Sequence, residues 1–196
     1  NTTGGTGGTI KVRGERVGLV GAARINASGD SGGGTVLVGG NYQGKGPEAN
    51  ASRTVVGSEA VIDASARAQG DGGKVIVWSD DTTAYTGTIL ARGGAQGGNG
   101  GFLEVSGKKR VHFDGEADRR APRGAAGRLL LDPMSPTIGT DADLNGDDTM
   151  TSDDLVGSPL LFGDFGGADS QITANRVATL LATGDVTLQA TSRIVV

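Results

Sequence analysis

The segment GGKVIVWSDDTTAYTGTILARGGAQGGNGGFLEV, residues 72–105, contains the pattern that decides the fold of this chain. Two glycines open a short run of alternating residues, GGKVIV, and the same arrangement returns at the end of the segment as GGFLEV. Alternation with a period of two is typical of β-strands, because successive side chains of a strand point to opposite faces. The segment therefore spans one unit of a β-repeat and the start of the next.

The same marker of two glycines followed by alternating residues recurs along the chain. It is found as GGTIKV (7–12), GGTVLV (33–38), GGKVIV (72–77) and GGFLEV (100–105), with a degenerate copy, AGRLLLD, at 126–132. The second positions of these markers, 8, 34, 73, 101 and 127, are separated by 26, 39, 28 and 26 residues. The long interval contains the polar, Pro-containing stretch 41–53, which we interpret as a loop inserted into one repeat.

A second short apolar phrase lies between the markers, as ARINA (23–27), AVIDA (60–64) and GTILA (87–91). Each repeat therefore holds at least two short strands, and a period of about 20 to 30 residues is typical of a β-solenoid with parallel strands. Glycine suits the corners of such repeats, because it tolerates positive φ and lets neighbouring backbones approach closely.

The composition favours a compact β-protein. Of the 196 residues, 37 are glycine and only five are proline, and no strict three-residue glycine period is present, which excludes collagen. The aromatic residues are one Trp, two Tyr and four Phe, so the core is expected to consist of Val, Ile, Leu and Ala, which suit strands. We predict an all-β solenoid with few helices; an antiparallel sandwich and extensive disorder stay open as alternatives.

The chain divides into three parts. Residues 1–133 carry the glycine-rich repeats with the loop insertion 41–53. Residues 134–170 lack the markers and are predicted to form an acidic loop-rich insertion. Residues 171–196 are predicted to form a further coil, in which 175–182 is either a helical turn or a corner of the solenoid. Because the sequence ends within an apparent strand, we expect the chain to be a fragment of a longer one.

Residues 70–115, GDGGKVIVWSDDTTAYTGTILARGGAQGGNGGFLEVSGKKRVHFDG, followed by GRLLLDP (127–133), resemble the filamentous haemagglutinin-like exoproteins of bacterial two-partner secretion. The resemblance covers residues 32–133 well and the remainder more loosely. It implies a right-handed parallel β-helix, export through an outer-membrane transporter of the two-partner type, and a place outside or on the outer surface of a Gram-negative cell. It implies adhesion, aggregation or biofilm formation, and it does not imply an active site. The family's Asn-rich secretion motifs are not visible, so the chain is expected to lie downstream of them.

The charge pattern bears on the partners. The net charge is −4 and the basic residues are scattered, which argues against binding to a nucleic-acid backbone. No apolar run of about 18 residues is present, so we expect no membrane-spanning helix. The absence of cysteine excludes disulfides and thiolate metal sites.

The acidic insertion contains a pattern with calcium-loop spacing, DLNGDDTMTSDD (143–154), which resembles the loop of a dockerin repeat. A calcium ion needs six to eight oxygens around a tightly wound loop. The predicted ligands at loop positions 1, 3, 5, 7, 9 and 12 are Asp143, Asn145, Asp147, the carbonyl of Thr149, a water on Thr151, and Asp154.

One position departs from the calcium-loop pattern. Asp148 stands at position 6, where glycine is usual, and a register that starts at Asp141 would place Gly146 there but Ser152 at position 12. We prefer the first register because it keeps the terminal carboxylate. A solvated acidic turn that caps a short helix stays open as the alternative.

Other candidate residues give weaker signals. Asp80 and Asp81 are adjacent and so point to opposite faces of a strand, which argues against the paired carboxylates of a polysaccharide hydrolase. His112 is expected to be an outward surface residue. Trp78 is expected to pack in the core rather than to stack on a sugar. The charged runs 108–110 and 118–120 are expected to be solvated loop charges.

We therefore expect a non-enzymatic, secreted adhesin or filament segment, stiffened by one Ca²⁺ ion, that contacts a host or neighbouring-cell surface or a polysaccharide. Open solenoid ends would also permit head-to-tail self-association. The alternatives are a polysaccharide-binding or polysaccharide-cleaving β-helix and a self-assembling extracellular matrix fibre.

Overall fold

The computed structural model describes residues 4–134, 136–139 and 170–190 of the chain. These residues form sixteen strands, one short 3₁₀-helix and one α-helix. The strands form three sheets, and all neighbouring strands in each sheet are parallel. The prediction of an all-β chain with parallel strands and little helix is confirmed, and the antiparallel sandwich is excluded.

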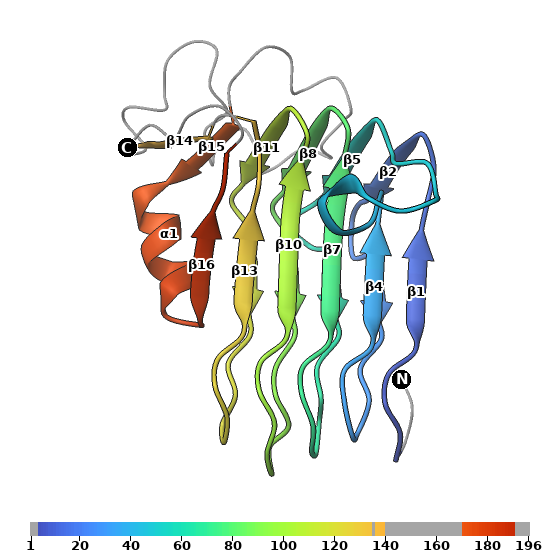
Figure 1. Cartoon of the computed structure of the whole chain (residues 1–196), viewed down its shortest axis with the longest axis vertical. Coiled ribbons are helices and arrows are strands. Elements are labelled where there is room, and N and C mark those ends of the chain that lie inside the picture. The colour runs from blue at the N-terminus through green and yellow to red at the C-terminus, as the bar shows by residue number, and fades with distance from the viewer. Residues whose placement is uncertain (1–3, 135, 140–169, 191–196) are drawn as a thin grey trace.

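The chain passes through the three sheets in turn and then begins the next repeat (Figure 1). The first sheet contains, in spatial order, β1 (Thr9–Val12), β4 (Thr35–Val38), β7 (Lys74–Ser79), β10 (Phe102–Gly107), β13 (Arg128–Leu131) and β16 (Asp185–Leu188). The second contains β2 (Arg16–Leu19), β5 (Arg53–Val56), β8 (Thr82–Tyr85), β11 (Arg110–Phe113), β15 (Ser170–Thr173) and β14 (Pro136–Gly139). The third contains β3 (Arg24–Asn26), β6 (Val61–Asp63), β9 (Thr88–Leu90) and β12 (Glu116–Asp118).

The register of the first sheet follows the glycine markers. The residues directly after the second position of each marker pair with one another across five strands; they are Thr9, Thr35, Lys74, Phe102 and Arg128. Asp185 continues this row from β16. It follows Gly184, so the structure adds a sixth repeat whose marker the sequence pattern does not reveal. The markers therefore coincide with the register of five of the six strands of this sheet.

The first glycine of a marker is required because two backbones meet there. A Cβ atom at Gly33 would lie 1.8 Å from the carbonyl oxygen of Ala64, and one at Gly100 would lie 1.8 Å from that of Arg119. Each of these glycines lies just before a first-sheet strand, and the carbonyl oxygen that it approaches lies just after the third-sheet strand of the same repeat. Any side chain would separate the repeats at this corner.

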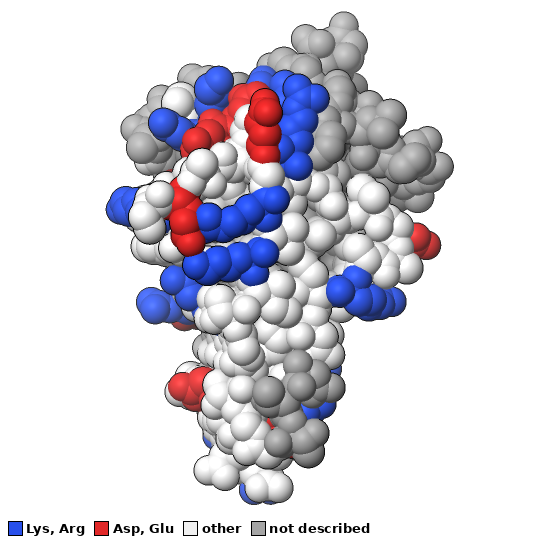
Figure 2. Space-filling view, turned by 90° about the vertical axis from the view of Figure 1, so that its right-hand side faces the viewer, with Lys and Arg blue, Asp and Glu red and all other residues white. Residues whose placement is uncertain are grey.

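Figure 2 shows the end of the molecule formed by β1, β2 and β3. Charged side chains gather mainly in its upper half, and the narrower lower part is largely uncharged.

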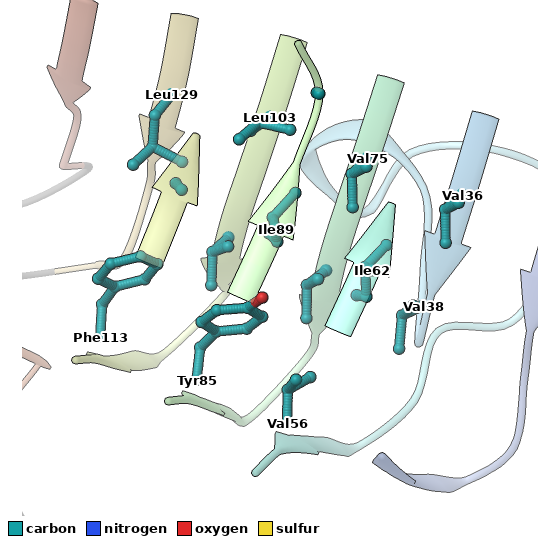
Figure 3. Packing of buried hydrophobic residues seen from close by; sticks show 14 of the residues in the cluster. Val36, Val38, Val56, Ile62, Val75, Tyr85, Ile89, Leu103, Phe113 and Leu129 are labelled. Atoms are coloured by element: carbon teal, nitrogen blue, oxygen red, sulfur yellow. The ribbon is translucent and has the colours of Figure 1, made fainter. Parts of the chain in front are cut away.

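The core lies between the sheets and consists of ladders of similar side chains (Figure 3). In the first sheet the fully buried Val36, Val75, Leu103 and Leu129 follow one another in register. The second sheet contributes a ladder of Val56, Tyr85 and Phe113, in which the two rings stack with centroids 5.4 Å apart. The third sheet contributes Ile62 and Ile89. Each such side chain stabilises the fold by about 1.5 to 3 kcal/mol.

The fifth repeat departs from the order of the others. β15, rather than the earlier β14, pairs with β11 and so continues the second sheet, while β14 lies outside β15. The chain then forms α1 (Ala174–Leu181) instead of a strand of the third sheet. The Thr173 side chain caps α1 by accepting a hydrogen bond from the Arg176 amide at 3.1 Å. Of the two alternatives for 175–182, the helix is therefore the observed one.

Arg119 corrects the prediction for residues 118–120, because it is fully buried rather than solvated. Its guanidinium donates hydrogen bonds of 2.9 to 3.0 Å to the carbonyl oxygens of Ala117, Leu180, Gly184 and Asp185 and to the Thr183 hydroxyl. Burial lowers the pKa of Arg119 to about 10, so the group stays charged at neutral pH. Arginine is present here because the carbonyl groups after α1 need donors.

No helix among the described residues is long and apolar enough to cross a membrane. The division into residues 1–133, 134–170 and 171–196 stays a prediction.

Candidate functional site

The inserted loop lies against the outer face of the first sheet. Residues 40–50, which we call the cover loop, include the 3₁₀-helix η1 (Tyr42–Gly44) and leave β4 to rejoin the repeat at β5 (Figure 1). The predicted insertion 41–53 falls between β4 and β5, except that Arg53 already belongs to β5. Its two ends are fixed, because the amide of Ala51 donates to the carbonyl of Gly39 at 2.6 Å and the amide of Asp80 donates to that of Ala51 at 2.9 Å.

The cover loop buries a second cluster of side chains, which we call the covered patch. It consists of Leu37, Ile76, Trp78, Phe102 and Glu104, which occupy the outer-facing positions of β4, β7 and β10. This cluster is separate from the core between the sheets. The covered patch therefore spans three repeats, although the cover loop belongs to one of them.

Trp78 is buried, but not in the core between the sheets. Its side chain lies on the outer face of β7 beneath Gly44, whose φ is +65° and whose Cβ, if present, would lie 2.5 Å from the indole. The indole N–H donates to the Asp80 carboxylate at 3.2 Å, and the Asn50 amide donates to the same oxygen at 3.1 Å. The expected burial of Trp78 is therefore correct, while its expected place in the core is wrong.

Glu104 is the exceptional residue of the covered patch. The register places it between Ile76 and Leu130, so a carboxylate occupies a position that neighbouring repeats fill with aliphatic side chains. It is fully buried, and its two oxygens lie 3.1 and 3.2 Å from the backbone nitrogen of Gln43, which donates to them. Burial raises the pKa of Glu104 from 4.5 to about 7.

Charged groups around Glu104 modify this shift. Asp132 raises the pKa of Glu104 further, whereas the Gln43 amide, the Ser106 hydroxyl and the positive charge of Lys74 lower it. Burial also raises the pKa of Asp132, with opposing effects from the Gln43 side chain and from Lys45. Two carboxyl groups with raised pKa values therefore lie on either side of Gln43.

Gln43 adopts an unfavourable backbone conformation in order to reach Glu104. Its φ of +52° makes it the sole non-glycine residue with positive φ in the described parts of the chain. Left-handed geometry in a residue with a Cβ costs about 1 to 2 kcal/mol. The side chain of Gln43 accepts a hydrogen bond from Lys45 at 2.8 Å and donates a long one to Asp132 at 3.5 Å.

The rim of the cover loop makes weaker contacts. The Tyr42 ring meets Phe102 edge-on with centroids 5.7 Å apart, and the Lys74 ammonium lies 5.3 Å from the centre of the Tyr42 ring. Glu48 forms ion pairs with Lys11 at 2.7 Å and with Arg13. The side chains of these ion pairs are 29 to 44% exposed, so the pairs contribute little to the free energy of folding.

Asp80 and Asp81 contact different side chains. Asp80 bonds to the cover loop and to Trp78, whereas Asp81 lies within 3.3 to 3.5 Å of Arg53, Arg110 and Lys109. Burial opposes the shift, but Lys109, Arg110 and Arg53 together lower the pKa of Asp81. The two carboxylates have different neighbours, but both residues lie in the bend between β7 and β8 rather than within a strand, where they were expected.

His112 corrects another expectation. It occupies an outward-facing position between Val111 and Phe113, as predicted, but it is 3% exposed rather than a surface residue. Burial, with a smaller effect from Arg110, lowers the pKa of His112 to about 4. The imidazole is therefore neutral at neutral pH.

A second charged cluster lies beside α1. Asp118 binds Arg92 at 2.7 Å and Arg120 at 2.6 Å, and it is 9% exposed, so the expectation of a solvated loop charge at this residue is wrong. Burial opposes the shift, but the side chain and amide of Arg120, together with Arg92, lower the pKa of Asp118 to about 2. An open depression of about 730 Å³ lies next to it, between Pro122 and Leu181.

The predicted calcium ligands lie outside the described residues; they are Asp143, Asn145, Asp147, Thr149, Thr151 and Asp154. Within residues 4–134, 136–139 and 170–190, no group of three or more His, Cys, Asp or Glu side chains could hold a metal ion. Calcium binding stays a prediction.

Glu104 is a site residue that was not predicted from the sequence. The signal was present, because alignment of the markers places Glu104 in the same position as Leu37, Ile76 and Leu130. The register shows that a charge interrupts an apolar row, but it does not show that a loop from another repeat covers it.

Comparison with protein-family models gives no match for this chain, and comparison with curated protein sequences gives none either.

Proposed function

We propose that the chain is a segment of a non-enzymatic, secreted protein of the outer bacterial surface, built as a right-handed parallel β-helix that acts as an adhesin or filament. The observation that carries this proposal is the in-register stack of first-sheet strands from β1 to β16. Parallel strands that pass repeatedly through three sheets give a stiff body that grows along one axis. The right hand follows from the strong preference for right-handed crossovers between parallel strands.

Adhesion is testable with the purified chain. We expect beads coated with the folded chain to bind bacterial or epithelial cell surfaces, or films of bacterial polysaccharide, more strongly than beads coated with chain unfolded by heat. The same polysaccharides are incubated with soluble chain, and new reducing ends are measured. Equal binding of folded and unfolded coatings would contradict the adhesive role, and release of reducing ends would favour the polysaccharide-cleaving alternative.

Head-to-tail association is a second candidate, favoured by the edges of the sheets. Among the described strands, β1, β2 and β3 each pair on one side, and they form the end shown in Figure 2. Unpaired strand edges are templates for pairing with another chain. A matrix fibre subunit should show sedimentation that depends on concentration, and a monomer at all concentrations would contradict this candidate.

Calcium binding at Asp143–Asp154 completes the proposal. Calcium in excess over its dissociation constant should raise the melting temperature relative to chelator, because a ligand that binds only the folded state stabilises it. Asp143→Ala should remove this increase, whereas Ser152→Ala, which alters no ligand of the preferred register, should keep it. An increase that survives Asp143→Ala would contradict the assignment.

A further inference from the structure

The cover loop is joined to the rest of the molecule in two different ways. Its ends are held by short backbone hydrogen bonds at Gly39 and Ala51. Its middle is held by the rim contacts and by the hydrogen bonds around Gln43 and Asn50. Residues 40–50 can therefore lift while β4 and β5 keep their pairing, since the strand ladders do not include them.

Glu104 is poorly compensated for a buried carboxylate. It accepts the single amide hydrogen of Gln43, shared between its two oxygens, and interacts with the Ser106 hydroxyl. No ion pair found among the described residues involves Glu104. A buried charge without a paired cation is disfavoured, whereas a neutral carboxyl group in the same place is tolerated more easily.

We propose that the cover loop is a pH-dependent latch over the covered patch, closed while Glu104 is protonated and opened when Glu104 loses its proton. The loop must lift for the ionised carboxylate to reach water, because Gln43 lies directly on it. Opening exposes the indole of Trp78 and the side chains of Leu37 and Ile76. The latch thus converts a change of pH into exposure of an apolar surface.

The direction of the pH dependence follows from proton binding. In the closed state the pKa of Glu104 is about 7, against an ordinary value of 4.5 once the side chain is in water. The closed state therefore binds more protons between these values, and opening becomes more favourable as the pH rises from 4.5 to 7. The full effect on the opening equilibrium constant is about 300-fold.

The other charged groups near Glu104 have opposing effects on its protonation. Asp132 follows β13 and favours the protonated form of Glu104, while Lys74 on β7 favours the ionised form. Lys45 of the cover loop acts mainly on Asp132, whose own pKa is raised. The raised pKa values in this cluster belong to the carboxyl groups of Glu104 and Asp132.

The absence of cysteine from the chain permits a direct test by thiol labelling. Leu37→Cys places a thiol beneath the cover loop, and Val38→Cys places a matched thiol at the next residue, on the inner face of the same strand. The rate of labelling by an aromatic disulfide reagent is measured from pH 5 to pH 8 for each cysteine variant, once with Glu104 present and once combined with Glu104→Gln. Dividing the first rate by the second removes the intrinsic pH dependence of the thiol.

For Leu37→Cys we expect this ratio to rise by up to about 70-fold between pH 5 and pH 8 and to level off above pH 7, since part of the full change lies below pH 5. For Val38→Cys it should stay constant. Glu104→Leu, which restores the aliphatic row, is a second background without a carboxyl group. It replaces Glu104→Gln as the reference if the buried amide perturbs the fold. Glu59→Gln, an exposed control of the same chemistry, should behave as the natural chain.

Three results would overturn the proposal. The first is a constant ratio for Leu37→Cys. The second is a ratio that rises equally for Val38→Cys, which would indicate opening of the whole repeat. The third is loss of the β-signal in circular dichroism over the same pH range, which would indicate global unfolding.

Discussion

The two faces of the first sheet bury their side chains by different means. On the inner face, Val75, Leu103 and Leu129 follow one another in register and pack against the other two sheets. On the outer face, Ile76 and Trp78 are buried equally well, but only because one loop of one repeat lies over them. Burial on the inner face is shared by all repeats, whereas burial on the outer face depends on a single local contact.

The inner face provides stability that is common to all repeats, whereas the outer face carries the features that distinguish one repeat from another. The inner ladders repeat the same chemistry, so each repeat supports its neighbours and no single one defines a site. The covered patch occurs once among the described repeats and holds a carboxyl group and the indole of Trp78, and the strained Gln43 of the cover loop lies over it. Features that can respond to the surroundings therefore lie on the outer face.

The largest expected effect is on the inner face. Leu103→Ala should lower the free energy of unfolding by about 3 kcal/mol, because the buried ladder cannot collapse around the cavity. Ile76→Ala, on the outer face, should cost roughly half as much, since the cover loop can settle into the space. Urea denaturation at pH 6 measures both. Equal losses would remove the distinction between the two faces.

The next effect concerns the charge in the covered patch. Burial raises the pKa of Glu104, so its stabilising protonated form is fully present below pH 4.5 and is lost as the pH rises to about 7. The stability of Glu104→Leu relative to the natural chain should therefore grow by up to about 3 kcal/mol between pH 4 and pH 8. Denaturation curves of both proteins at several pH values measure this difference.

The pH effect of Glu104 must be measured as a stability difference between Glu104→Leu and the natural chain, because His112 also makes stability depend on pH. Its folded pKa is lowered, so the unfolded chain takes up a proton first, and stability is lost as the pH falls from 6.5 to 4. This change opposes that of Glu104 in the natural chain but is common to both proteins and cancels in the difference. A difference that does not change with pH would contradict the assignment to Glu104.

A smaller effect is expected from a polar atom in the inner core. The hydroxyl of Tyr85 is buried and has no hydrogen-bond partner among the described residues, and Figure 3 shows it pointing into the core. Tyr85→Phe should leave stability unchanged or raise it by about 1 kcal/mol, while the stacking on Phe113 is kept. A loss of stability measured by thermal denaturation would show that the hydroxyl has a partner.

The smallest effect belongs to the rim of the cover loop. Glu48→Gln removes the ion pairs with Lys11 and Arg13, which are exposed to solvent and screened by salt. We expect no measurable change in the melting temperature and a slight increase in labelling of Leu37→Cys at low salt. If the melting temperature falls clearly, the rim rather than Glu104 holds the loop closed.

Much of the fold could be predicted from the sequence because its information is periodic. The markers at Gly33, Gly72 and Gly100 place the strands of the first sheet in their observed register. The phrases 23–27, 60–64 and 87–91 contain the third-sheet strands β3, β6 and β9. The second-sheet strands were less evident, since their inner positions include polar residues such as Thr54 and Thr83, which bond to the carbonyls of Trp78 and Ser106 at 2.7 Å.

The candidate site could be predicted only in part. The stretch 41–53 is recognisable as a loop, and Trp78 as a residue that would be buried. Which residues the loop covers follows from its path across three strands, and no local pattern encodes that path. The predictions for Arg119 and His112 failed for the same reason, because a polar or charged side chain is solvated only if no distant segment packs over it.

The sequence by itself therefore determined the repeat, the alternation of inner and outer positions along each strand, and the place of the inserted loop. These properties depend on the order of residues within one repeat and on backbone geometry. The tertiary structure alone decided which outer positions are covered and how Glu104 and Arg119 are compensated. Burial and electrostatics depend on residues that are distant in the chain, so they are fixed only when the repeats, the cover loop and α1 come together.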